Sequence, residues 1–97
     1  MNNWQFLTPY GLVLHYVTEN PKHTVRQIAR FLGYTERTVI NVIDRLVESG
    51  YLIKNKSGRT NSYSTNTELP LRHPAKNDIP VKNLLQSLNN ESESLAY

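Results

Sequence analysis

An arginine, an isoleucine and an asparagine stand at positions 37, 40 and 41, a spacing that places all three on one face of a helix. Arginine can donate hydrogen bonds to both major-groove acceptors of guanine, and asparagine can pair in the same bidentate way with adenine. An aliphatic side chain can contact the methyl group of thymine. Arg37, Ile40 and Asn41 are therefore candidate base readers, although Ile40 could equally be a residue at the edge of the core.

Hydroxyl and basic side chains close to these three have the chemistry of phosphate contacts. Thr35 and Thr38 would lie at the start of the same helix, where free backbone N–H groups attract phosphate. Both threonines could instead simply cap the helix, and for Thr35 both roles are compatible. Arg26 and Arg30 lie one turn apart on the preceding segment and could contact the DNA backbone.

Arg45 and three basic residues further along the chain complete the candidate set. Arg45 could contact DNA, but an ion pair with Glu48 or with a residue of the following hairpin is the favoured alternative. Lys54, Lys56 and Arg59 lie in a predicted hairpin, among small and polar residues. Arg59, at its tip, would suit a narrow A/T-rich minor groove, which attracts arginine; otherwise it is a solvated turn residue.

The candidate readers need a rigid helix, and residues 24–50 predict two. Thr24 and Gln27 have the spacing of a capping box, and Gly33 can take the positive φ that ends the first helix. Thr35 would cap the second helix, at about 35–49, and Gly50 would close it. Apolar residues at helical spacing give each helix a buried face: Val25, Ile28, Ala29 and Leu32 in the first, and Val39, Val42, Ile43, Leu46 and Val47 in the second.

The turn between these helices has a typical spacing. Ala29 is followed four residues later by Gly33 and six further on by the branched aliphatic Val39, as in a helix-turn-helix, whose second helix enters the major groove. An ordinary helical hairpin shares the caps and the periodicity, so the alternative stays open. DNA binding is the favoured interpretation because of the flanking elements.

Those flanks predict a third helix and a hairpin. Thr8-Pro9 indicates a helix that starts with a capping threonine and runs to about residue 18 or 19. Lys22-His23 could form a short strand. Residues 52–65 read as a β-hairpin, with its turn at Ser57-Gly58, in the position of a wing. The predicted fold is mainly α with a small β-wing (α+β): a winged helix-turn-helix with a three-helix core, the hairpin and a short C-terminal helix.

The two parts of the chain differ in charge. The net charge is +3, and residues 1–66 hold eight Lys and Arg against four Asp and Glu, whereas residues 67–97 hold three against four. The basic excess therefore falls on the predicted helix-turn-helix and hairpin, as expected of a surface that meets phosphates. We expect residues 1–66 to form a DNA-binding domain, and 67–97 an extended connector, an amphipathic helix at about 81–89 and a polar tail.

Several functional classes find no support in the composition. The chain has no cysteine, which excludes disulfides and thiolate metal sites, and its three histidines have unrelated spacings, so we expect neither a metal nor a cofactor. No nucleophile elbow, phosphate-binding loop or paired-acid cleft appears, so an enzyme is not expected. No apolar run could cross a membrane and no signal peptide begins the chain, which predicts a cytoplasmic protein.

Residues 8–66 resemble the winged-helix transcriptional regulators of bacteria and archaea, the broad MarR/ArsR-like superfamily. The resemblance rests on TVRQIARFLGYTERTV, NVIDRLVESGYL and GRTNSY, and LPLRHP with a following short helix is similar to compact regulators within that group. It does not extend to the long terminal dimerisation helices and ligand pocket of full-length MarR-type regulators. The sequence, which has no cysteine, also lacks the cysteine-based metal site of many ArsR-type sensors.

Together these features predict a sequence-specific regulator that binds double-stranded DNA as a homodimer and whose effector, if any, is unknown. Its dimer seam could be the C-terminal helix or the first helix, where Tyr10 and Leu14 form a second apolar stripe. The C-terminal helix could equally fold onto the first helix of its own chain. The alternatives from other classes are a winged helix used as a protein-interaction module and a replication-associated nucleic-acid binder.

Overall fold

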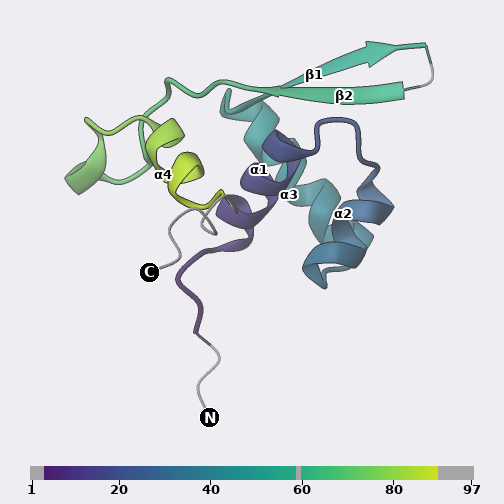
Figure 1. Cartoon of the computed structure of the whole chain (residues 1–97), viewed down its shortest axis with the longest axis horizontal. Coiled ribbons are helices and arrows are strands. Elements are labelled where there is room, and N and C mark those ends of the chain that lie inside the picture. Colours follow the sequence, from purple (N-terminus) through teal and green to yellow (C-terminus); the bar gives the residue numbers. More distant parts are fainter. Residues whose placement is uncertain (1–3, 59, 90–97) are drawn as a thin grey trace, which may run out of the picture. The chain divides into compact units, whose positions relative to one another are not determined.

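The computed structural model describes residues 4–58 and 60–89, and the chain divides into two compact units, Met1–Asn66 and Thr67–Tyr97. The first unit contains three helices followed by an antiparallel hairpin, as predicted (Figure 1). Its elements are α1 (Pro9–Glu19), α2 (Val25–Leu32), α3 (Glu36–Glu48), β1 (Leu52–Ser57) and β2 (Thr60–Thr65).

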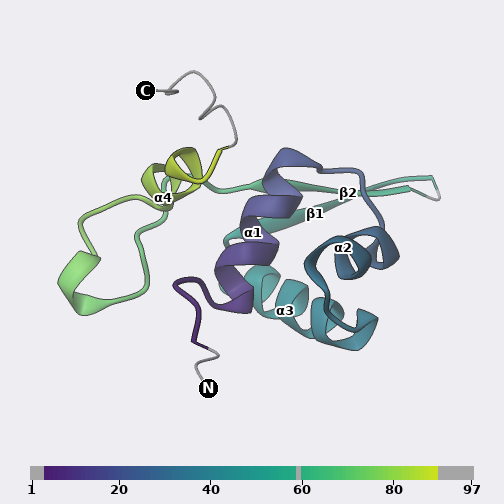
Figure 2. The ribbon, with the colours of Figure 1, turned by 60° about the horizontal axis from the view of Figure 1, so that its bottom comes forward.

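The core of the first unit takes buried apolar side chains from four elements, α1, α2, α3 and β1. Helix α3 packs against α1, α2 and strand β1, and α1 also packs against β2 (Figure 2). The side chains that are almost completely buried are Val13 and Val17 of α1, Ile28 of α2, Val39 of α3 and Leu52 of β1. Because each element buries its own apolar face, the orientation of α3 is held by the whole core.

Local sequence signals account for the ends of α2 and α3. The Thr24 hydroxyl accepts a hydrogen bond from the Gln27 N–H (3.2 Å) while the Gln27 side-chain oxygen accepts one from the Thr24 N–H (2.8 Å), which confirms the capping box. Gly33 ends α2 with a φ of 79°. Its N–H and that of Tyr34 both donate to the Ala29 carbonyl, so only three residues separate the end of α2 from the start of α3.

The start of α1 differs in one respect from the prediction. Thr8 occupies the N-cap position and Pro9 the first helical position, but the Thr8 side chain makes no capping hydrogen bond. At the other end, the Thr18 hydroxyl donates to the Leu14 carbonyl (2.7 Å) and lies 2.6 Å from the Thr65 hydroxyl. Since the Thr18 proton is already used, Thr65 must be the donor, and this bond ties the base of the hairpin to α1.

The hairpin occupies the predicted residues 52–65, but its turn lies one residue later than expected. Leu52 pairs with Thr65 and Ser57 with Thr60, so Ser57 belongs to β1 and Gly58, with a φ of 64°, begins a two-residue connection. Residues 22 and 23 do not form the short strand that was considered. Residue 22 lies in a turn at 21–22 and residue 23 follows it, and the only strand-like feature there among the described residues is the hydrogen bond from the Tyr63 N–H to the Pro21 carbonyl.

The second unit contains an extended segment, one turn of 3-10 helix and a short α-helix. The 3-10 helix η1 (Pro74–Lys76) was not foreseen; the His73 side chain caps it by accepting a hydrogen bond from the Ala75 N–H (3.0 Å). Helix α4 (Val81–Ser87) ends two residues before its predicted end. Its first turn is held by backbone hydrogen bonds from the Val81 N–H to the Leu69 carbonyl and from the Lys82 N–H to the Thr67 carbonyl.

Candidate DNA interface

Helix α3 has one buried and one exposed face, and the three candidate base readers lie on the exposed one. Val39, Val42, Ile43 and Leu46 are buried. The exposed residues are Glu36, Arg37, Ile40, Asn41, Asp44, Arg45 and Glu48. Ile40 keeps 45% of its surface exposed, so it is not a buried core residue, and a place at the edge of the core stays compatible with this exposure. An isoleucine so exposed on an otherwise polar face is a surface that a partner can cover.

Charge along this face changes from one end of α3 to the other. The centre of the exposed face carries Arg37 and Asn41 in its first half and Asp44 and Glu48 in its second. Carboxylates are repelled by phosphates, whereas arginine and asparagine can pair with bases in the major groove. The face is therefore suited to enter a groove by its N-terminal half.

The two threonines at the start of α3 form a hydroxyl pair. The Thr35 hydroxyl accepts a hydrogen bond from the Thr38 N–H (3.1 Å) and donates to the Thr38 hydroxyl (2.9 Å), so Thr35 caps the helix as predicted. Thr38 accepts this bond and makes no other side-chain hydrogen bond among the described residues. Its own hydroxyl proton thus remains available to a phosphate oxygen.

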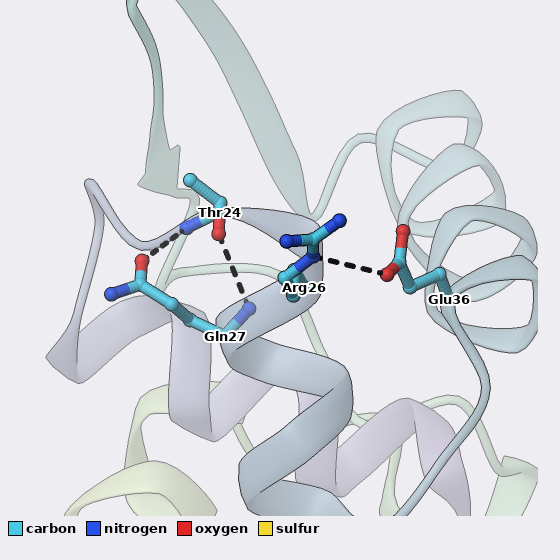
Figure 3. A network of polar contacts seen from close by, with 4 residues as sticks. All are labelled: Thr24, Arg26, Gln27 and Glu36. Atoms are coloured by element: carbon cyan, nitrogen blue, oxygen red, sulfur yellow. Dashed lines mark hydrogen bonds and ion pairs between the residues drawn. The ribbon is translucent and has the colours of Figure 1, made fainter.

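Arg26 of α2 reaches the start of α3. Its Nε lies 3.5 Å from an oxygen of Glu36, and Figure 3 shows the two side chains extending toward each other beside the capping box of Thr24 and Gln27. This pair was missed from the sequence; the only signal was an arginine in the first turn of one helix and a glutamate at the start of the next. Arg30 lies one turn after Arg26 and is exposed.

The favoured structural role of Arg45 is wrong. No acidic side chain among the described residues, Glu48 included, lies within ion-pair distance of the Arg45 guanidinium. Arg45 and Glu48 are three residues apart on a solvated helix surface, where such a pair gains little and loses side-chain entropy. Arg45 therefore stays an exposed cation on the same helix as the candidate readers.

The basic residues of the hairpin lie on one face of β1. Lys54 and Lys56 alternate with Ile53 and Asn55, so both lysines share the face of the buried Leu52, and both are exposed. The hairpin continues beyond the helices in both views of the first unit (Figures 1 and 2). Arg59, the predicted minor-groove probe, lies outside the described residues.

Tyr63 marks where the hairpin meets α3. Burial, and secondly the negative charge of Asp44, raise the pKa of the Tyr63 phenol above its ordinary value. Tyr63 pairs with Lys54 across the two strands, and strand β1 packs against α3. The hairpin thus packs against the same helix that carries the candidate readers.

The described residues contain neither a metal-binding cluster nor a membrane-spanning helix. In residues 4–58 and 60–89, no three His, Asp or Glu side chains come together in a way that could hold a metal ion. Over the same ranges, no helix combines the length and the apolar character that crossing a membrane requires.

A three-helix core whose third helix exposes a polar face, followed directly by an antiparallel hairpin, defines a winged helix-turn-helix domain. The sequence model of the MarR family matches residues 6–60, more than half of the chain. The chain therefore belongs to the MarR family of winged-helix transcriptional regulators. No match was found among the curated proteins.

A solved structure supports the fold. The transcriptional regulator SlyA has a similar chain, with a TM-score of 0.54 and 22% sequence identity. The similarity covers 63% of this chain and 45% of that chain, so the present chain corresponds to less than half of the length of SlyA. At this identity the likeness establishes the winged-helix fold and nothing finer.

Proposed function

We propose that this chain regulates transcription in the cytoplasm by binding double-stranded DNA sequence-specifically as a homodimer, with α3 in the major groove and the hairpin at the minor groove. The observation that carries the proposal is the joint exposure of Arg37, Ile40 and Asn41 on the first turns of a helix that the core holds rigidly. In this docking mode, residues near the start of the recognition helix contact the base edges.

Each candidate reader has a distinct chemistry in the proposed complex. Arg37 donates to the two acceptors of a guanine, Asn41 pairs with an adenine, and Ile40 contacts a thymine methyl group. Each bidentate pair contributes about 1–3 kcal/mol of discrimination against the wrong base. The preferred half-site should therefore contain both a G·C and an A·T pair close together.

The remaining candidates hold the phosphate backbone in this proposal. Thr35 and Thr38 lie at the N-terminus of α3, Arg26 and Arg30 on the exposed side of α2, and Arg45 further along α3. Lys54, Lys56 and Arg59 would follow the backbone and the minor groove from the hairpin. The phosphate contacts set the position of the protein without reading the sequence, whereas Arg59 in the minor groove would add a preference for A/T-rich flanks.

Salt dependence tests this proposal. A dimer that makes roughly 6–10 phosphate contacts should lose about 10³–10⁵ in affinity between about 50 and 200 mM salt. Fluorescence anisotropy with a duplex selected by the protein measures this directly. Lys56→Ala should lower the slope of log affinity against log salt by about 2, about 1 for each chain of the dimer, whereas the charge-neutral change Asn55→Ala should leave it unchanged. A flat response of the wild-type protein would exclude the proposed mode.

A further inference from the structure

The contact between Arg26 and Glu36 lies at the point where α2 and α3 begin. The capping box fixes the first turn of α2, where Arg26 is the second residue, and Glu36 is the first residue of α3 (Figure 3). The pair therefore joins the starts of two helices, next to the Thr35 and Thr38 hydroxyls. Glu36 is the acid nearest in sequence to the candidate reader Arg37.

The geometry of this contact is weak enough to be exchanged. The Arg26 Nε and the Glu36 oxygen are 3.5 Å apart, whereas strong charge-assisted hydrogen bonds between such groups measure about 2.7–2.9 Å. The side chains are 76% and 55% exposed, so water and salt screen their attraction. A phosphate offers the same guanidinium a bidentate partner of higher charge.

The position of Glu36 makes it unfavourable for DNA. In the proposed complex the start of α3 is the end that enters the major groove, so a carboxylate there lies close to phosphates and repels them. In the free protein this carboxylate also occupies the one guanidinium of α2 that reaches α3 among the described residues. Both effects act against any duplex, whatever its sequence.

We propose that Glu36 competes with a DNA phosphate for Arg26 and so lowers the affinity of the protein for duplex DNA of every sequence. The inference rests on the proposed function and deepens it. Glu36 thereby limits phosphate-driven binding to unrelated DNA, which otherwise supplies most non-specific affinity. Base contacts by α3 then contribute a larger share of the free energy of DNA binding.

A double-mutant cycle tests the competition. Glu36→Gln, Arg26→Ala and the double variant are titrated by fluorescence anisotropy against a selected and a scrambled duplex at one salt concentration. Glu36→Gln should tighten binding about two- to five-fold per chain on both duplexes. In the Arg26→Ala background this gain should fall by at least half, because no guanidinium is left to release. Glu48→Gln, which removes an exposed acid at the other end of α3, should give a smaller gain.

Three results would overturn the inference. An equal gain with and without Arg26 would mean that Glu36 acts only by its charge. No gain would mean that Arg26 does not meet phosphate, and a sequence-dependent loss would mean that Glu36 itself contacts a base. If the wild-type protein binds neither duplex, the proposed function fails and this inference with it; if it binds and the cycle shows no coupling, only the inference fails. Thermal melting followed by circular dichroism confirms that every variant is folded.

Discussion

Individual side chains of α3 belong either to the buried core or to the exposed face that we propose reads DNA. Val39, Ile43 and Leu46 are buried, while Arg37 and Asn41 have no place in the core. Replacing a buried aliphatic residue by alanine costs about 2–5 kcal/mol, whereas an exposed substitution usually stays within about 0.5 kcal/mol. Loss of DNA recognition can therefore be separated from loss of structure in this helix.

Tyr63 gives a prediction about stability in alkali. Its raised pKa means that the folded protein favours the neutral phenol, so this stabilisation is complete below the ordinary value of 10.0 and is lost as pH rises through the raised pKa. Wild-type protein should therefore lose stability more steeply than Tyr63→Phe as the pH rises above 10.0. Urea denaturation at several pH values measures the difference. Tyr10→Phe, at an exposed tyrosine, is the control and should follow the wild type.

At the scale of elements, the turn between α2 and α3 depends on Gly33. An added Cβ would meet nothing within 4 Å, so the cost of Gly33→Ala comes from its φ of 79° alone. We expect a loss of about 1 kcal/mol in the free energy of unfolding, measured by urea denaturation. Gly33→Asn should lose less, because asparagine tolerates the left-handed region. Equal stability of Gly33→Ala and wild type would show that the turn can adopt another conformation.

The helices were predictable because their signals are local. The capping box of Thr24 and Gln27, the cap of Thr35 and the apolar periodicity of α3 all act within a few residues. The hairpin was harder to delimit. Its turn lies one residue later than predicted because the register of the strands is set by cross-strand pairing, such as that of Leu52 with Thr65. The types of Ser57 and Gly58 alone do not determine this register.

Contacts between distant residues could not be predicted from the sequence. The Arg26–Glu36 pair requires two helix starts to meet, and the Thr18–Thr65 hydrogen bond joins residues 47 positions apart. The absence of an Arg45–Glu48 ion pair among the described residues could not be predicted either, because the spacing of the two residues shows only that such a pair is possible. The sequence therefore predicted the exposed face of α3 as the candidate site, but it did not predict the ion pair between Arg26 and Glu36.

At the scale of the whole molecule, the exposure of apolar side chains indicates which surface could form an interface between two copies of the chain. Leu14 of the first helix and Leu85 of the C-terminal helix, the two elements considered for a dimer seam, are both buried. Trp4 and Phe6 form an edge-to-face pair and remain 68% and 91% exposed. Exposed aromatic residues next to each other are typical anchors of a protein interface.

We therefore expect the dimer to depend on the N-terminal aromatic pair. Replacing both Trp4 and Phe6 by alanine should raise the dimer dissociation constant about tenfold or more, as measured by sedimentation equilibrium. Phe31→Ala removes another aromatic ring, 72% exposed, from α2 and serves as the control, with no expected change. An unchanged dimer in the double variant would place the seam elsewhere.

The central claim is that α3 reads bases, and selection of bound sequences from random duplex DNA tests it most directly. Wild-type protein should enrich an inverted repeat with half-sites about 10–10.5 base pairs apart. Arg37→Ala and Asn41→Ala should each lose preference at particular base pairs, by about 1–3 kcal/mol, with a nearly unchanged melting temperature. Arg30→Ala, the phosphate-contact control, should weaken binding equally on all sequences. If Arg37→Ala and Asn41→Ala select the same motif as wild type with the same preferences, α3 is not the recognition helix.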